Sequence, residues 1–313
     1  MMYRTDKPYK EQILSLIQNT WETNFVSVKN SALTKKFSLP EFSSTDGVGT
    51  KGVYHWNKRT FKEAVIDALA MNLNDLVLMR ARPYKLQNHI LIPEDDHDAI
   101  LEIIEIFVSE CKMRGIAIVG GETSVHDNIK GMDISVSVDG FIEELRKNKF
   151  QTGDVLIGLK SNGIHSNGFT RIRELYGDEY REEFTHPTLI YSDKILDIDK
   201  RYEIHGMTHI TGGAFSKIKG FLGEADAEIT NNHKLKPHNI FYDIYHKCLN
   251  DGEMYKTFNC GVGFVLGVPK KSAYGIVSEF NLLGLKADVI GEVHDGSGKV
   301  KIESMFSNEN VIL

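Results

Sequence analysis

The chain has 313 residues, of which 41% are hydrophobic, so it can bury a sizeable core, and its length predicts two domains. Its formal net charge of −6 argues against a general nucleic-acid or membrane-surface binder, because binding a phosphate backbone needs a basic face. A small anionic ligand is compatible with this charge, since backbone amides and a metal ion can hold it locally.

The cysteines and the N-terminus predict a soluble cytoplasmic protein. Cys111, Cys248 and Cys260 are odd in number and far apart, and they match neither a disulfide framework nor a zinc-ligand pattern. The N-terminus is polar, and no run of about 18 apolar residues occurs, so we expect no membrane partner.

In the first half of the chain, residues 9–18 predict a short helix, and the twenty-odd residues after them are polar and irregular. Apolar residues at helical spacing predict a long helix from Thr60, with Pro83 as its outer limit. A second helix opens at residues 93–96 and closes at Gly115. Strands are expected at 116–119 and 134–138.

Charged residues at 143–149 interrupt the apolar pattern and predict a boundary between domains 1–146 and 147–313. Further strands are expected at 155–159, 206–211, 259–268 and 288–293. This mixture of strands and helices indicates an α/β or α+β fold.

The segment 44–51, STDGVGTK, predicts a nucleotide–magnesium site. Asp46 can hold a hard cation, Gly47 and Gly49 let backbone amides approach a polyphosphate, and Lys51 can neutralise a phosphate oxygen. The alternative is a plain Asp-Gly turn. The Lys-Ser/Thr pair of a Walker A loop is missing.

Asp75 is a second candidate, because an unpaired carboxylate in the apolar segment 71–79 would be costly to bury. We expect Asp75 to converge with Asp46 and Glu122 on Mg²⁺ ions that bridge ATP phosphates. The alternatives are an exposed helix face or a cap for Asp75, and a salt-bridged surface turn for Glu122.

Three further segments place glycines next to polar residues at strand–helix junctions, where unpaired amides can bind an anion. They are Gly120–Thr123 (GGET), His165–Gly168 (HSNG) and Thr211–Gly213 (TGG). His165 can donate to a substrate phosphate or assist proton transfer, whereas Ser166 or Asn167 can instead be an ordinary helix cap. Asn259 can face a ligand, but Cys260 has no neighbouring base and is not expected to be a nucleophile.

Taken together, these segments resemble the phosphoribosylformylglycinamidine cyclo-ligase family, also called aminoimidazole ribonucleotide synthetases. The blocks that carry the resemblance occur in the family's order and span about residues 44 to 293: TDGVGTK at 45–51, NDLV at 74–77, VGGET at 119–123, HSNG at 165–168, TGG at 211–213 and MYKTFNCGVG at 254–263.

The resemblance implies an ATP-dependent ring closure in purine biosynthesis on a two-domain α/β ATP-binding fold. It also implies a homodimer formed through the N-terminal domain, with the active site in a cleft. Lys51, His165 and Asp75 would be catalytic, and Asp46, Asp75 and Glu122 would hold Mg²⁺. Nucleotide contacts would come from Asp46, Gly47, Val48, Gly49, Thr50, Lys51, Gly120 and Gly121. Contacts to formylglycinamidine ribonucleotide would come from His165, Ser166, Asn167, Thr211, Gly212, Gly213 and Asn259.

Two other functions stay open at this point. One is a related small-molecule phosphotransferase that resembles thiamine-monophosphate kinase. The other is a non-catalytic paralogue that keeps the fold to bind a nucleotide or a protein partner.

Overall fold

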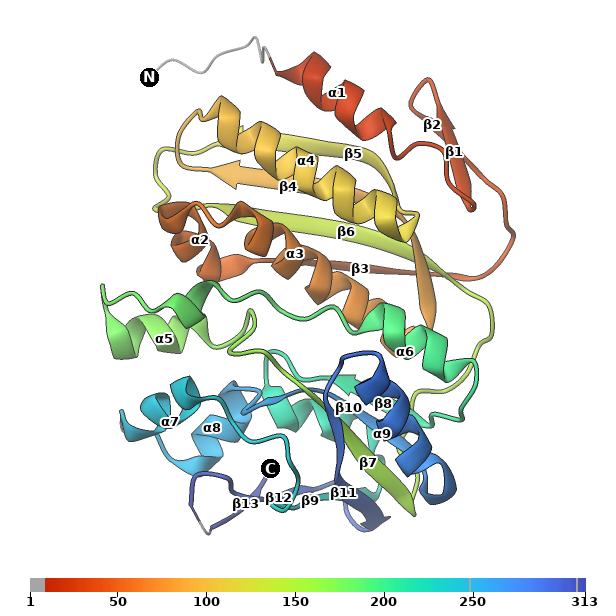
Figure 1. Ribbon diagram of the computed structural model, residues 1–313, viewed down its shortest axis with the longest axis vertical. Helices are drawn as coiled ribbons and strands as arrows, with labels where there is room; N and C mark the ends of the chain where they lie inside the picture. Colours follow the sequence, from red (N-terminus) through yellow and green to blue (C-terminus); the bar gives the residue numbers. More distant parts are fainter. Residues whose placement is uncertain (1–8, 248, 308) are drawn as a thin grey trace. The chain divides into compact units, whose positions relative to one another are not determined.

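The computed structural model describes residues 9–247, 249–307 and 309–313, so Cys248 and the first eight residues lie outside the described part. The chain divides into two compact units (Figure 1). The first comprises Met1–Leu76 with Ala81–Glu143, and the second comprises Val77–Arg80 with Glu144–Leu313. The division after Glu143 lies close to the boundary predicted after residue 146, but the prediction did not include the short segment 77–80.

The first unit is built on a four-stranded sheet in the order β3-β6-β4-β5, in which only β4 and β5 run parallel. Helices α3 and α4 lie across one face of this sheet (Figure 1). The elements in chain order are α1 (Lys10–Gln18), β1 (Val26–Lys29), β2 (Ala32–Lys35), β3 (Glu41–Gly47), the 3₁₀ turn η1 (Gly49–Lys51), α2 (Gly52–Lys58), α3 (Phe61–Leu76), β4 (Ala81–Ile92), α4 (His97–Arg114), β5 (Ala117–Val125) and β6 (Asp133–Ile142).

Local sequence explains where helix α4 begins and ends. The carboxylate of Asp96 caps α4 by accepting from the amide of Ala99 at 2.9 Å, and Gly115 ends the helix with a left-handed φ of 68°. The helix predicted from Thr60 is confirmed as α3. Pro83, its expected outer limit, instead lies within β4 at a break in the β4–β6 register, where a residue without an N–H is tolerated.

The second unit contains a seven-stranded sheet in the order β13-β12-β9-β11-β7-β10-β8. Its elements are η2 (Val77–Met79), β7 (Asp154–Lys160), α5 (Phe169–Tyr176), η3 (Glu182–Thr185), α6 (Ser192–Asp199), β8 (Gly206–His209), η4 (Ala214–Phe221), β9 (Ala225–Ile229), α7 (Asn239–His246), α8 (Asp251–Thr257), β10 (Val262–Pro269), η5 (Lys270–Ser272), α9 (Ala273–Leu282), β11 (Ala287–Asp295), β12 (Val300–Glu303) and β13 (Asn310–Ile312).

The core of the second unit joins the central strands to helices α6 and α9. Ile157, Phe264 and Leu266 from the sheet pack with Ile195 and Phe280 from the helices. The four strands predicted here are confirmed as β7, β8, β10 and β11. Within the described residues, no helix is both long and apolar enough to span a lipid bilayer.

Candidate active site

The predicted phosphate loop begins at the end of a strand. Asp46 and Gly47 are the last residues of β3, and the Asp46 carboxylate accepts from the amide of Gly47 at 2.7 Å. The buried Val48 donates its amide to the carbonyl of Ile134 at 3.1 Å. Gly49 then turns the chain with φ 62°, and the half-buried Thr50 follows. This geometry favours a loop shaped by glycine over a plain Asp-Gly turn.

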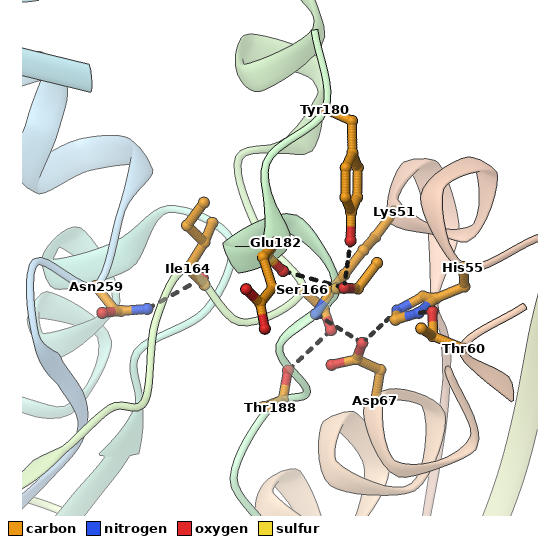
Figure 2. Close-up of polar contacts among 11 residues, drawn as sticks. Lys51, His55, Thr60, Asp67, Ile164, Ser166, Tyr180, Glu182, Thr188 and Asn259 are labelled. Atoms are coloured by element: carbon orange, nitrogen blue, oxygen red, sulfur yellow. Dashed lines mark hydrogen bonds and ion pairs between the residues drawn. The ribbon is translucent and has the colours of Figure 1, made fainter. Parts of the chain in front are cut away.

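Lys51 lies at the end of this loop in a buried charge network, in which its side chain and that of Asp67 are both 0% exposed. Its Nζ is 2.7 Å from Oδ2 of Asp67, and Nε2 of His55 is 2.9 Å from the same oxygen. On the other side of the imidazole, Nδ1 lies 2.8 Å from the hydroxyl of Thr60. Figure 2 shows these contacts converging on Asp67. Two ionised groups without solvent access are tolerated only when they are paired in this way.

Burial and pairing have opposite effects on the two charged groups. Burial lowers the pKa of the Lys51 ammonium, and the neighbouring Asp67 carboxylate opposes that shift. Burial by itself would raise the pKa of Asp67, but the contacts with Lys51 and His55 outweigh it and hold that pKa well below its usual range. The Asp67 carboxylate is therefore ionised at neutral pH.

Asp46 and Asp75 lie on neighbouring parts of the first unit. Asn72, on α3, donates to the carbonyl of Asp46 at 3.2 Å. Asp75 follows Asn72 by three residues on the same helix, and residues at this spacing are neighbours on a helix surface. Asp75 is half-buried in the last turn of α3. Two carboxylates in this region can serve a Mg²⁺ ion whose other ligands are phosphate oxygens and water.

Glu122 lies apart from these two carboxylates. The strand register places four residues in one row across the sheet: Asp46, Val136, Asn88 and Gly121. Glu122 follows Gly121 along β5 and therefore lies in the next row. Successive side chains on a strand point to opposite faces, and three strand spacings amount to about 14 Å. Among the described residues, no group of three His, Cys, Asp or Glu side chains is placed to hold a metal ion. The predicted convergence of three carboxylates on one ion is therefore not seen within this chain.

The GGET segment instead lines a cavity of about 290 Å³ in the first unit. Lys10 of helix α1 and Tyr9, which precedes the helix, line its wall, and the Glu122 carboxylate accepts from the amide of Thr123 at 2.9 Å. The remaining lining is largely apolar: Ile13, Ile17, Ile104 and Ile118, with Asn88, Gly120 and Gly121. A mixed lining of this kind is typical of a small-molecule pocket.

In the second unit, His165 is held by close packing. It is 1% exposed and has a left-handed φ of 66°, which is uncommon for a residue with a side chain. A Cβ at Gly263 would lie 2.7 Å from its ring and 2.0 Å from the hydroxyl of Tyr191. That hydroxyl donates to the carbonyl of Lys160 at 2.9 Å. Glycine at position 263 therefore allows the HSNG loop to pack against β10.

Asn259 positions the start of the same loop. Its amide nitrogen donates to the carbonyls of Gly163, at 2.8 Å, and Ile164, at 3.1 Å, the second of which is drawn in Figure 2. Its oxygen accepts from the hydroxyl of Ser161 and the amide of Gly261. Asn259 is 3% exposed, and both ends of its amide are used within the protein. In this structure it shapes the loop, and its predicted contact with substrate stays a prediction.

The HSNG and TGG segments lie next to each other. The hydroxyls of Ser166 and Thr188 are 2.8 Å apart (Figure 2), and a Cβ at Gly212 would lie 3.5 Å from Oδ1 of Asn167. Within the described chain, the amide nitrogen of Asn167 is buried and has no hydrogen-bond partner. This amide is a donor that a ligand oxygen can use.

Two helices start at these segments with glycine caps. Gly168 begins α5 with φ 79°, and Gly213 begins η4 with φ 80°. Neither helix has a side-chain cap, and a helix start of this kind suits a phosphate or carboxylate. The hydroxyl of Thr211 accepts from Lys217, which adds a positive charge.

Asp67 and His55 were not among the residues predicted from the sequence. The signal for Asp67 was present, because this carboxylate interrupts the apolar run of α3 in the same way as Asp75. His55 carried no such signal, because a lone histidine between two aromatic residues of a short helix is ordinary.

Comparison with known proteins agrees with the resemblance seen in the sequence. The AIR synthase related N-terminal domain matches residues 40–142, and the corresponding C-terminal domain matches residues 151–303. A phosphoribosylformylglycinamidine cyclo-ligase of Saccharolobus solfataricus is 33% identical over 93% of this chain and 90% of its own. One of Sulfurisphaera tokodaii is 37% identical over 84% and 82%.

A solved structure shares the fold at much lower identity. The hydrogenase maturation protein HypE, crystallised in complex with ATP, is 16% identical, with a TM-score of 0.72 over 99% of this chain and 95% of that one. This likeness concerns the architecture alone. The two domain matches and the identities of 33% and 37% carry the assignment: the chain belongs to the phosphoribosylformylglycinamidine cyclo-ligase family of AIR synthase related proteins.

Proposed function

We propose that this protein converts formylglycinamidine ribonucleotide and ATP into aminoimidazole ribonucleotide, ADP and phosphate. The observation that carries the proposal is membership of the cyclo-ligase family over nearly the whole chain. The chain also retains the TDGVGTK, GGET and HSNG segments. The second candidate is a thiamine-monophosphate-kinase-like phosphotransferase, which shares the fold.

The chemistry has two steps. An amide oxygen is a poor leaving group, so ATP first phosphorylates the formyl oxygen and ADP departs. The amidine nitrogen then attacks the activated carbon, the ring closes, and the C–O bond to phosphate breaks. Proteins promote such transfers mainly by positioning the reactants and neutralising charge.

We assign the nucleotide phosphates to the first unit. The loop of Gly47, Val48, Gly49 and Thr50 would border the phosphates beside Lys51, and Gly120 and Gly121 would contribute from the cavity on β5. Asp46 and Asp75 fit Mg²⁺, because both side chains are carboxylates. Asn72, three residues before Asp75 on α3, donates to the carbonyl of Asp46. When bound, the ion would offset phosphate charge. Glu122 would act from the cavity, through a separate contact.

We assign formylglycinamidine ribonucleotide to the second unit. The amide of Asn167 and the helix starts at Gly168 and Gly213 would bind its anionic group, with Ser166, Thr211 and Gly212 alongside. His165 would donate a proton or a hydrogen bond to the substrate. Asn259 would act through the loop that it holds.

We further propose a cytoplasmic homodimer formed through the first unit. Helices α3 and α4 cover one face of its sheet, and the opposite face carries exposed polar side chains, such as the paired hydroxyls of Thr45 and Ser137. Substituting Ser137 by Arg should dissociate the dimer in sedimentation experiments. Cys111 and Cys260 are buried thiols without a disulfide, which suits a reducing compartment.

The deciding experiment measures ADP release from ATP and Mg²⁺ with formylglycinamidine ribonucleotide, with thiamine monophosphate, or with no second substrate. Release that depends on formylglycinamidine ribonucleotide supports the cyclo-ligase. Release with thiamine monophosphate selects the kinase. Nucleotide binding without any release would identify a non-catalytic paralogue.

A further inference from the structure

The buried network around Lys51 has a local origin in the connection between α2 and α3. Helix α2 ends at Arg59, which takes a left-handed φ of 55°. The chain then reverses, so that the amide of Thr60 donates to the carbonyl of His55 at 3.0 Å. The same reversal brings the hydroxyl of Thr60 to Nδ1 of His55. The Thr60 hydroxyl thereby holds the imidazole of His55 through Nδ1, the ring nitrogen that does not contact Asp67.

This arrangement sets the tautomer of His55. If Nδ1 accepts from the Thr60 hydroxyl, Nε2 carries the proton and donates to Oδ2 of Asp67. That oxygen accepts a second hydrogen bond from the ammonium of Lys51. These contacts form a directed series of hydrogen bonds from Thr60 through His55 and Asp67 to Lys51. Lys51 lies at the end of the glycine loop, Asp46–Gly49.

Burying these charged groups costs free energy, and a purely structural role does not account for that cost. Removing a carboxylate and an ammonium from water costs several kcal/mol per ion, and well-packed apolar residues in their place are often as stable or more so. A fully buried pair next to a proposed phosphate site is better explained by a need for a fixed positive charge.

We propose that Asp67 and His55 are positioning residues of this site: Asp67, oriented by His55, holds the Lys51 ammonium charged and fixed beside the Asp46–Gly49 loop, where it serves the phosphates of a nucleoside triphosphate. The inference rests on the proposed function. It adds residues that act through Lys51.

Two carboxylates help keep Lys51 protonated. Asp67 does so by direct contact and Glu63 through the longer-range electrostatic field, and both raise the pKa that burial lowers. His55 faces Lys51 across Asp67, and Asp133 of β6 contacts the loop through the amide of Gly49. Loss of Asp67 should therefore let Lys51 deprotonate at a lower pH than in the wild type.

The test is Asp67→Asn, which keeps the shape of the side chain and removes its charge. We expect kcat for ADP release to fall by about 10²-fold, as for a misplaced catalytic group, with a smaller change in KM for ATP. The alkaline limb of the pH–kcat profile should move to lower pH. Calorimetric binding of ATP should weaken over the same pH range, which gives a measure independent of turnover.

Two control variants separate positioning from stability. Glu63→Gln removes a carboxylate of the same helix that raises the pKa of Lys51 only through the electrostatic field, so it should move the alkaline limb to lower pH by much less than Asp67→Asn does. Asp154→Asn removes a buried carboxylate that contacts His205 at 2.6 Å in the second unit. This variant should have a lower melting temperature and an unchanged alkaline limb of the pH–kcat profile.

An Asp67→Asn protein whose kcat, alkaline limb and ATP binding match those of Glu63→Gln would overturn the inference. If Asp67→Asn does not fold, His55→Gln decides, because it keeps the Lys51–Asp67 pair. A lower kcat with unchanged KM then supports positioning, and an unchanged kcat refutes it. If the wild type releases no ADP, the proposed function fails, and the pH dependence of ATP binding still tests the role of Asp67.

Discussion

The two units build their candidate sites from different materials. In the first unit, a buried ammonium, a carboxylate and an imidazole lie behind the glycine loop. In the second, the HSNG and TGG segments are held by amides, hydroxyls and close glycine contacts, and Lys217 donates to a neutral hydroxyl, that of Thr211. Charge that must be fixed is expensive to bury, whereas neutral groups tolerate burial once each has a partner. The first site should therefore depend on charge balance and the second on packing.

The largest expected effect comes from breaking the charge balance with Lys51→Met. This change leaves Asp67 buried without its ammonium, so the free energy of unfolding should fall by about 3–5 kcal/mol. Urea denaturation at pH 7 measures it. The double variant Lys51→Met, Asp67→Asn should recover a large part of the loss, because no buried charge is left. Equal midpoints for the single and double variants would show that the pair is not buried in solution.

Acid should reveal the next largest effect, and it arises in the second unit. Burial and the nearby Lys236 lower the pKa of His233 from 6.5 to about 4. Its Nδ1 accepts from the amide of Leu235 at 3.2 Å, which requires the neutral ring. Between pH 6.5 and 4 the unfolded chain binds a proton that the folded chain does not, so stability falls as the pH is lowered.

The full shift corresponds to about 3 kcal/mol, which is lost by pH 4. His233→Gln should remove most of this pH dependence. In the first unit, the lowered pKa of Asp67 keeps its ion pair intact over the same range. Hydrogen exchange at pH 4.5 should therefore show the second unit opening first, and simultaneous opening would count against this difference between the units.

The same contrast explains what the sequence could and could not predict. Helices α3 and α4 were predictable because their apolar spacing is local, as are the caps of α4. The hairpin β1–β2 was not, because its exposed positions are polar or charged and only a few side chains, such as Val26 and Val28, pack inward. Glycine segments marked the candidate site residues of both units. Asp67 acquires its meaning only when folding brings it to Lys51, sixteen residues earlier in the chain.

Packing in the second unit can be tested with Gly263→Ala. The new methyl group would overlap Tyr191 and the ring of His165, both of which are buried, so the surrounding side chains must move. We expect a loss of about 1–3 kcal/mol in unfolding free energy, together with a lower kcat/KM. Gly220→Ala is the control, since a Cβ there meets no atom within 4 Å. Equal stability of the two variants would mean that the HSNG loop does not pack against β10.

The smallest effect concerns the hydrogen bond between Ser166 and Thr188, and it gives the most direct comparison with the charged network. Ser166 belongs to the proposed substrate side, and its partner Thr188 is fully buried. A neutral hydrogen bond contributes about 0.5–1.5 kcal/mol, so a double-mutant cycle of Ser166→Ala and Thr188→Val should give a coupling of this size. The same cycle on Lys51 and Asp67 should give a coupling several times larger. Because a charged pair loses far more than a neutral pair when one partner is removed, similar couplings in the two units would contradict the distinction between a site built on charge and a site built on packing.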